Sequence, residues 1–168
     1  MTTAPTPHYV GEVMDVYHIA FDGSLLQRGF WLYVWSVQTP DDERLIYVGR
    51  TGDTSSPNAQ SPFRRIGQHV DPNPKSRNNA LTRHLRERGV APKHCRFAFT
   101  ALGPIFGEAE TMKYHIPLRD RMGALERCVA DWFTNKGFSV LGSHPKRRQV
   151  DADIWRRIES ELRERFAV

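Results

Sequence analysis

The strongest constraint on the fold is a pair of apolar, strand-forming runs separated by a short polar loop. The first run, residues 30–37, is aromatic and β-branched, which is typical of a strand covered on both faces. The second run, residues 45–49, follows a polar stretch that contains Pro40. A short connection between two strands favours an antiparallel hairpin. We therefore expect this hairpin to form the centre of the fold.

The length of the loop predicts which residues face one another across the hairpin. A loop over residues 38–42 would place Tyr33 directly opposite Tyr47. Directly opposed residues point to the same face of a sheet. The two phenols are therefore expected to share one face, where they either pack in the core or contribute to a site.

The remaining pattern predicts helices around a small sheet. Residues 9–21 are compatible with either an edge strand or a short helix. Ser61 and Pro62 are typical of a helix N-cap and first helical position, and Gly137 is typical of a helix end. In chain order we expect a loop over 51–60, helices over 63–70 and 78–89, a strand over 95–102, and helices over 119–136 and 151–166.

These elements predict an α+β fold with a small, mainly antiparallel three-stranded sheet flanked by helices. We expect an N-terminal extension over residues 1–29 and a main domain over residues 30–145. Residues 146–168 would add a C-terminal helix packed on the same domain. The alternative is that the apolar side of this helix binds a partner protein.

Composition narrows the class of protein. Hydrophobic residues make up 39% of the 168 residues, which is enough for a core. No apolar run approaches the roughly 20 residues that a membrane span needs, and residues 1–7 lack the pattern of a signal peptide. The two cysteines fit no metal-binding spacing. We expect a cytoplasmic protein with reduced thiols and no membrane partner.

Basic residues are concentrated in one part of the chain. Residues 64–96 hold nine Lys and Arg against two acidic residues, whereas the rest of the chain holds fifteen basic and seventeen acidic residues. A local excess of cations is what a polyanion binder needs, although a solvated basic face has the same composition. Charge alone leaves the two interpretations open.

Three further residues are candidates for chemistry. Arg65 and His69 are four residues apart on a predicted helix, so they project from the same side. Glu126 lies about 70° from the centre of the apolar stripe of its helix, so it borders the core. A carboxylate in that position needs a metal or a cationic side chain, and both remain open. No zinc-protease, paired-cysteine or phosphate-loop motif is present.

Taken in order, these residues resemble the GIY-YIG nuclease family. Leu32-Tyr33-Val34 and Tyr47-Val48-Gly49 are similar to its two short motifs. Arg65 and His69 resemble its helical arginine and histidine, and Glu126 resembles its metal-binding glutamate. The resemblance covers residues 30 to about 145, and the stretch from Gly142 to Pro145 is similar to the restriction-enzyme branch. The family's usual asparagine after the glutamate is absent, and Ser143 or His144 stands in its region.

This resemblance implies a metal-dependent DNA endonuclease that leaves 5′-phosphate and 3′-hydroxyl ends. Glu126 would bind Mg²⁺ or Mn²⁺, and Arg65 would bind the phosphate. Tyr47, or Tyr33 together with His69, would orient and deprotonate the attacking water. A tyrosine could act as a base only if a neighbouring cation or metal lowered its pKa, and Arg65 and the metal would supply that charge.

The predicted DNA contacts are basic side chains on the two short helices, in the loop between them, and just after the main domain. They are Arg64, Lys75, Arg77, Arg83, Arg86, Lys146, Arg147 and Arg148. The DNA could be single- or double-stranded, and cutting both strands would call for a homodimer. The alternative to an enzyme is a non-catalytic DNA-binding module that retains the nuclease fold.

Overall fold

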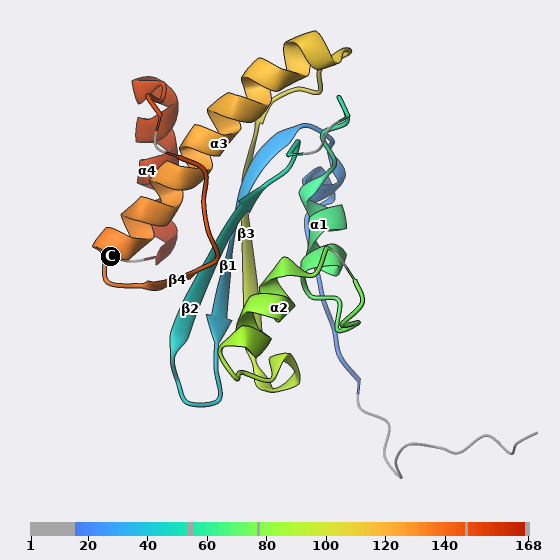
Figure 1. Ribbon diagram of the computed structural model, residues 1–168, viewed down its shortest axis with the longest axis vertical. Helices are drawn as coiled ribbons and strands as arrows, with labels where there is room; N and C mark the ends of the chain where they lie inside the picture. Colours follow the sequence, from blue (N-terminus) through green and yellow to red (C-terminus); the bar gives the residue numbers. More distant parts are fainter. Residues whose placement is uncertain (1–15, 54–55, 77, 147, 167–168) are drawn as a thin grey trace, which may run out of the picture.

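The computed structural model describes residues 16–53, 56–76, 78–146 and 148–166. Figure 1 shows a central sheet with helices on both sides. The elements, in order, are η1 (Gly23–Leu26), β1 (Phe30–Gln38), β2 (Arg44–Arg50), α1 (Pro62–His69), α2 (Ala80–Glu87), η2 (Pro92–His94), β3 (Arg96–Phe106), α3 (Met112–Asn135), β4 (Ser139–Leu141) and α4 (Ala152–Phe166). None of the described helices combines the length and apolar character that a membrane span requires.

The α+β class is confirmed, but the predicted three-stranded sheet is wrong in its strand number. The sheet has four strands in the order β3-β1-β2-β4, and β4 runs parallel to β2. β4 has three residues, which is too short for an alternating pattern to mark it. Because β4 is parallel to β2 while the other pairs are antiparallel, the sheet is mixed rather than purely antiparallel.

The hairpin is confirmed, but its predicted register is wrong by two residues. Tyr47 lies opposite Trp35, and Tyr33 lies opposite Gly49. The strands extend through the Gln38–Arg44 pair, and the turn closes beyond it at Asp42, which has a φ of 65°. A shift of two residues preserves the alternation of side chains. Tyr33 and Tyr47 therefore still share one face of the sheet, as predicted.

Two apolar clusters cover the two faces of the sheet. One face packs against α3 and α4 through side chains such as Val34, Ile46, Val129 and Leu162. The other packs against α1 and α2, and its buried members are Tyr33, Trp35, Val37, Leu45, Leu81, Leu85 and Leu141. Figure 1 shows the same three layers. Tyr33 and Tyr47 thus lie on the face that α1 and α2 cover.

Helix boundaries follow the predictions at most positions. Ser61 is the N-cap of α1 and Pro62 its first residue, although the Ser61 side chain makes no capping hydrogen bond. α3 begins at Met112 rather than at residue 119, and it contains Pro117. Its first turns expose Tyr114 and Ile116, so they do not continue the buried stripe that marks the rest of the helix.

The N-terminal segment is described only from residue 16. Residues 16–22 form neither a strand nor a helix, so neither alternative for that stretch is observed there. The part of the prediction that falls on residues 9–15 lies outside the described residues.

Candidate functional site

A cavity of about 370 Å³ lies beside the end of β2. It brings together four predicted residues, Tyr33, Tyr47, His69 and Glu126. Its other lining residues are Gly49, Arg50, Asp53, Ser143, His144 and Pro145. Arg65, the fifth predicted residue, does not line the cavity itself, but it forms an ion pair with Asp53, which does.

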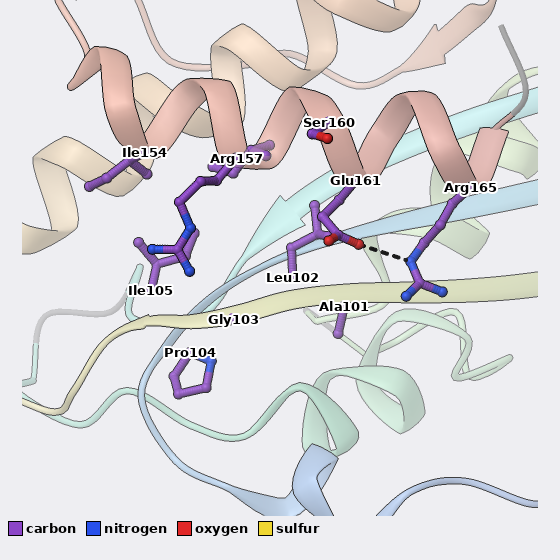
Figure 2. A pocket seen from close by; sticks show the side chains of 11 residues that line it. Ala101, Leu102, Gly103, Pro104, Ile105, Ile154, Arg157, Ser160, Glu161 and Arg165 are labelled. Atoms are coloured by element: carbon purple, nitrogen blue, oxygen red, sulfur yellow. Dashed lines mark ion pairs between the residues drawn. The ribbon is translucent and has the colours of Figure 1, made fainter.

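A larger cavity of about 530 Å³ lies between β3 and α4 (Figure 2). Its charged lining includes Glu161 and Arg165, which pair with each other at 3.5 Å. None of the residues predicted for catalysis lines it. Size alone therefore does not identify the site, and the smaller cavity holds the chemically equipped side chains.

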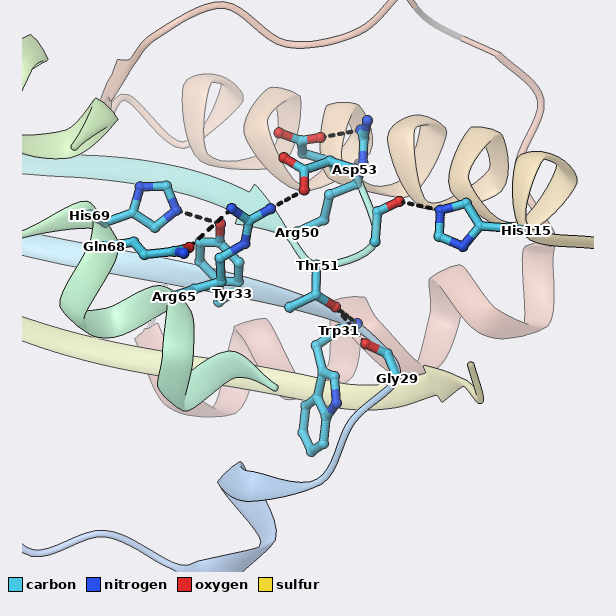
Figure 3. A network of polar contacts seen from close by, with 12 residues as sticks. Gly29, Trp31, Tyr33, Arg50, Thr51, Asp53, Arg65, Gln68, His69 and His115 are labelled. Carbon is cyan, nitrogen blue, oxygen red and sulfur yellow. Dashed lines mark hydrogen bonds and ion pairs between the residues drawn. The ribbon is translucent and has the colours of Figure 1, made fainter. Parts of the chain in front are cut away.

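Tyr33 is buried, and its hydroxyl lies 2.6 Å from Nε2 of His69 (Figure 3). The Tyr33 ring crosses the neighbouring strand at Gly49. A Cβ atom at that position would lie 2.5 Å from the ring. The Tyr33 phenol can therefore reach His69 only because residue 49 is a glycine.

Burial controls the protonation of both tyrosines. It raises the pKa of Tyr33 far above its usual range, while the nearby Arg65 guanidinium opposes the rise to a smaller extent. Burial, followed by the charge of Glu126, raises the pKa of Tyr47 to about 12. Protein groups alone therefore keep both phenols neutral at pH 7. The lowered tyrosine pKa that a base would require does not arise from Arg65.

His69 lies between the two tyrosine rings, with centroids 5.4 Å from Tyr33 and 5.1 Å from Tyr47. Burial, followed by the positive charge of Arg65, lowers the pKa of His69 to about 4. The imidazole is therefore neutral at pH 7, and one of its nitrogens is a hydrogen-bond acceptor. A neutral imidazole in contact with Tyr33 can receive a proton.

Arg65 is held in place on α1 by its own neighbours. Its side chain is 11% exposed and pairs with the Asp53 carboxylate. A second guanidinium nitrogen donates to Oε1 of Gln68 at 3.3 Å. This pairing orients Arg65 beside the cavity and attaches it to the loop that follows β2.

The start of that loop is fixed by hydrogen bonds to Gly29, to β1 and to α3 (Figure 3). The Thr51 hydroxyl donates to the Gly29 carbonyl at 2.6 Å and accepts from the backbone N–H of Trp31 at 2.8 Å. Nε2 of the buried His115, on α3, lies 3.0 Å from the Gly52 carbonyl oxygen. Asp53 follows directly, so these contacts position the partner of Arg65.

Glu126 reaches the cavity from α3, on the opposite side of the sheet from α1. One carboxylate oxygen, Oε2, pairs with Arg50, and both side chains are largely buried. The other, Oε1, lies 3.6 Å from Nδ1 of His144. The sequence left open whether Glu126 pairs with a cationic side chain or a metal. The structure shows a cationic side chain, Arg50. Gly123 makes room for it, because a Cβ there would lie 2.8 Å from Nη1 of Arg50.

Sequence reasoning did not select Arg50 or Asp53 as site residues. The signal for Arg50 was the alternation of β2, because Ile46 and Val48 face α3 and Arg50 continues that series. Asp53 lies in a loop, where no periodicity marks the direction of a side chain.

The predicted DNA-contacting side chains that the structure describes are all exposed. They are Arg64, Lys75, Arg83, Arg86, Lys146 and Arg148. Arg77 and Arg147 lie outside the described residues. Arg64 is on α1, and Arg83 and Arg86 are on α2, so these three belong to the helical layer over the tyrosine face. Lys146 follows the cavity residue Pro145.

Some of these cations have internal partners. Arg83 lies 3.8 Å from Glu87, and Arg148 lies 3.1 Å from Asp120. Arg86 donates to the carbonyl oxygen of Pro72 at 2.6 Å. Exposed pairs of this kind are weak, so a phosphate could replace the carboxylate partners at little energetic cost.

The donor set of the cavity fits a divalent cation with few protein ligands. Among the described residues, no three His, Cys, Asp or Glu side chains group as a metal cluster. Glu126 and His144 nevertheless face one another, and the remaining volume can hold water. A hard cation that keeps much of its hydration shell needs only one or two protein ligands. No family model, curated protein or solved structure matches this chain significantly.

Proposed function

We propose that this protein is a divalent-metal-dependent DNA endonuclease of the GIY-YIG type, which hydrolyses phosphodiester bonds to 5′-phosphate and 3′-hydroxyl ends. One observation carries the proposal. Tyr33, Tyr47, His69 and Glu126 come from four separate elements, β1, β2, α1 and α3, yet they line one cavity. Tyrosines that only pack a hairpin would not need a buried histidine and a carboxylate beside them.

Glu126 is the residue that would hold Mg²⁺ or Mn²⁺. Its carboxylate already lies against a guanidinium, so the position favours a positive partner. When bound, the metal would supply stabilisation of the charge on the phosphate and on the leaving 3′ oxygen. Arg50 would then be available to bind a phosphate oxygen.

Tyr33 and His69 would act together on the attacking water. The water oxygen would form the new bond to phosphorus as the bond from phosphorus to the 3′ oxygen breaks, and the 3′ oxygen would take a proton from solvent. The proton of the attacking water passes to the Tyr33 oxygen. The Tyr33 proton moves at the same time to Nε2 of His69, which lies 2.6 Å away. This route needs no phenolate, so it agrees with the raised pKa of Tyr33 and the neutral His69. Tyr47 would orient the water by its hydroxyl.

Arg65 would serve the phosphate from the α1 side. A guanidinium binds two phosphate oxygens through parallel N–H bonds, and such bonds strengthen as charge develops. Asp53 competes for the same guanidinium, so the ion pair must loosen when DNA binds.

A non-catalytic DNA-binding module is the second candidate, and one observation favours it. Arg50 satisfies Glu126 without a metal, as expected for a structural carboxylate. Both candidates keep the exposed basic side chains, so DNA binding does not separate them. Metal-dependent cleavage does.

The test is a cleavage assay on supercoiled plasmid and single-stranded DNA, with Mg²⁺, Mn²⁺ or EDTA. Wild type is compared with Glu126→Gln and with the control Glu164→Gln, which changes an exposed glutamate of α4. We expect metal-dependent cutting by wild type and the control alone. Salt-sensitive binding without any cutting would support the non-catalytic module instead.

We propose further that the enzyme works in the cytoplasm and cuts double-stranded DNA as a homodimer, in the manner of a restriction enzyme. One active site cuts one strand at a time, so a second copy would supply the second cut. The plasmid assay also tests this. Linear product formed without accumulation of nicked circles is expected for a dimer, whereas nicked product alone would contradict paired cutting.

A further inference from the structure

We propose that His144 is a second protein ligand of the metal, so that the cation is held by one carboxylate oxygen of Glu126 and one imidazole nitrogen. The inference rests on the proposed nuclease function and extends it, because it changes which metals the site prefers.

The His144 side chain is 8% exposed and lines the cavity. Neither of its ring nitrogens has a hydrogen-bond partner among the described residues. A buried polar group without a partner is costly, and native proteins rarely retain one without a reason. An imidazole directed at a cavity fits the preference of neutral histidine for metals.

The two acceptor atoms of Glu126 have different neighbours. Oε2 is taken by Arg50, whereas Oε1 faces Nδ1 of His144 at 3.6 Å. Two ligand atoms that share one divalent cation in adjacent positions lie about 3 Å apart, because each bond is roughly 2.0–2.2 Å long. A small closing movement of either side chain would allow both atoms to bind one cation.

The fold holds His144 in this place from both sides in the chain. Gly142 has a φ of 85° directly after β4, which turns the chain away from the sheet. Pro145 follows His144, and a proline restricts the backbone of the residue before it. Because β4 pairs in parallel with β2, this turn reaches the end of β2 where the cavity lies. The histidine is therefore preorganised rather than carried on a free loop.

A nitrogen ligand makes a specific prediction about the metal. Mg²⁺ and Ca²⁺ prefer oxygen ligands, whereas imidazole suits transition metals better. A site of one carboxylate and one imidazole is therefore expected to bind Mn²⁺ more tightly than Mg²⁺. Truncation of His144 should remove most of that preference.

The experiment is pulsed electron paramagnetic resonance of Mn²⁺ bound to the full chain, together with calorimetric titration of Mn²⁺ and Mg²⁺. Directly bound imidazole nitrogen modulates the Mn²⁺ spin echo. The proteins are wild type, His144→Ala, Glu126→Gln and the control His84→Ala, a histidine whose ring lies 6.2 Å from that of Tyr47. Circular dichroism checks folding, and His144→Gln replaces His144→Ala if the latter unfolds.

We expect nitrogen modulation in wild type and His84→Ala, its loss in His144→Ala, and about tenfold or greater weakening of Mn²⁺ binding in that variant. Nitrogen modulation that persists in His144→Ala, or its absence from wild type with bound Mn²⁺, would overturn the inference. Loss of Mn²⁺ binding in Glu126→Gln would still support the proposed nuclease site in either case. Unchanged Mn²⁺ binding in Glu126→Gln would overturn the nuclease site itself.

Discussion

The Tyr33 hydroxyl and Nε2 of His69 lie 2.6 Å apart, in a region where burial disfavours the charged form of both groups. A proton can therefore pass from Tyr33 to His69 only while Tyr33 takes up another proton, because the transfer alone would create a buried phenolate and a buried imidazolium. The pairing also depends on Gly49, because only a residue without a side chain lets the phenol cross β2. The contact therefore joins a strand tyrosine to a helix histidine across a strand glycine.

Tyr33→Phe is expected to abolish most cleavage while the protein remains folded. The change removes one hydroxyl, so the proton route to His69 is cut, and a loss of about 10²-fold or more in kcat is expected. Stability should fall by about 1–3 kcal/mol because Nε2 of His69 loses its partner. Single-turnover cleavage and urea denaturation measure the two effects. Tyr114→Phe, at an exposed position, serves as control. Cleavage at the wild-type rate by Tyr33→Phe would show that Tyr33 only packs in the core.

His69 is expected to make the protein less stable in mild acid. Its pKa is about 4 in the folded protein, below the usual value near 6.5 of an unfolded chain, so the unfolded state takes up the proton first as pH falls. Its contribution is fully present above about pH 6.5 and is lost as pH falls through 4, with a magnitude of about 3 kcal/mol.

Urea denaturation between pH 7.5 and 4 would measure this loss. The exposed His94, changed to Gln, provides the control. His69→Gln should flatten the slope, whereas His94→Gln should preserve it. Equal slopes in wild type and His69→Gln would show that His69 is not the group responsible.

Local patterns predicted the parts of the fold that depend on local physics. The hairpin, the N-cap and first residue of α1, and the buried stripe of α3 follow from alternation, capping and helical periodicity. The register was missed because it depends on where the turn closes, at Asp42. β4 was missed because its three residues form a strand only beside β2.

In the candidate site too, local patterns predicted some features and missed those that depend on tertiary contacts. The spacing of Arg65 and His69 predicted one helix face, and the hairpin placed both tyrosines on one face. The contacts of Arg50 with Glu126, and of Asp53 with Arg65, join residues that are distant in sequence. Such pairs arise from tertiary packing, which no local pattern encodes.

Removal of Arg50 should make the protein depend on metal for stability. In Arg50→Ala the Glu126 carboxylate, 12% exposed, loses its guanidinium partner, and breaking a buried pair costs roughly 3–5 kcal/mol. A divalent cation can replace the lost charge, so Mn²⁺ should raise the Tm of this variant more than that of wild type. Cleavage should fall because a phosphate ligand is lost.

Thermal melts with Mn²⁺ and with EDTA would measure the effect. Arg127→Ala removes another ion pair of α3, away from the cavity, and should show no added metal response. An equal Mn²⁺ shift in Arg50→Ala and wild type would show that the metal does not replace the charge of Arg50 beside Glu126.

His115 is expected to support activity from outside the cavity. His115→Phe keeps an aromatic ring beside Phe30 but removes the contact with the Gly52 carbonyl, at a cost of about 1–3 kcal/mol. The loop that carries Asp53 should then hold Arg65 less firmly, so kcat should fall while DNA affinity is retained. Cleavage and binding titrations separate the two. Partial recovery of kcat in His115→Gln would support a role for the hydrogen bond to Gly52. Unchanged kcat in His115→Phe would show that this hydrogen bond does not support activity.

The exposed basic side chains of α1 and the loop after it should determine the salt dependence of DNA binding. Arg64 and Lys75 have no carboxylate partner among the described residues, so each can contact a phosphate without breaking an ion pair. Each phosphate contact releases counterions, so Arg64→Ala and Lys75→Ala should each reduce the slope of log affinity against log salt by about 1. Arg163→Ala, whose arginine pairs with Glu159 on α4, should leave the slope unchanged. Fluorescence anisotropy from 50 to 300 mM salt, in EDTA to prevent cutting, would measure all four proteins. Equal slopes throughout would place the DNA on another surface, because a phosphate contact cannot be removed without changing the number of counterions released.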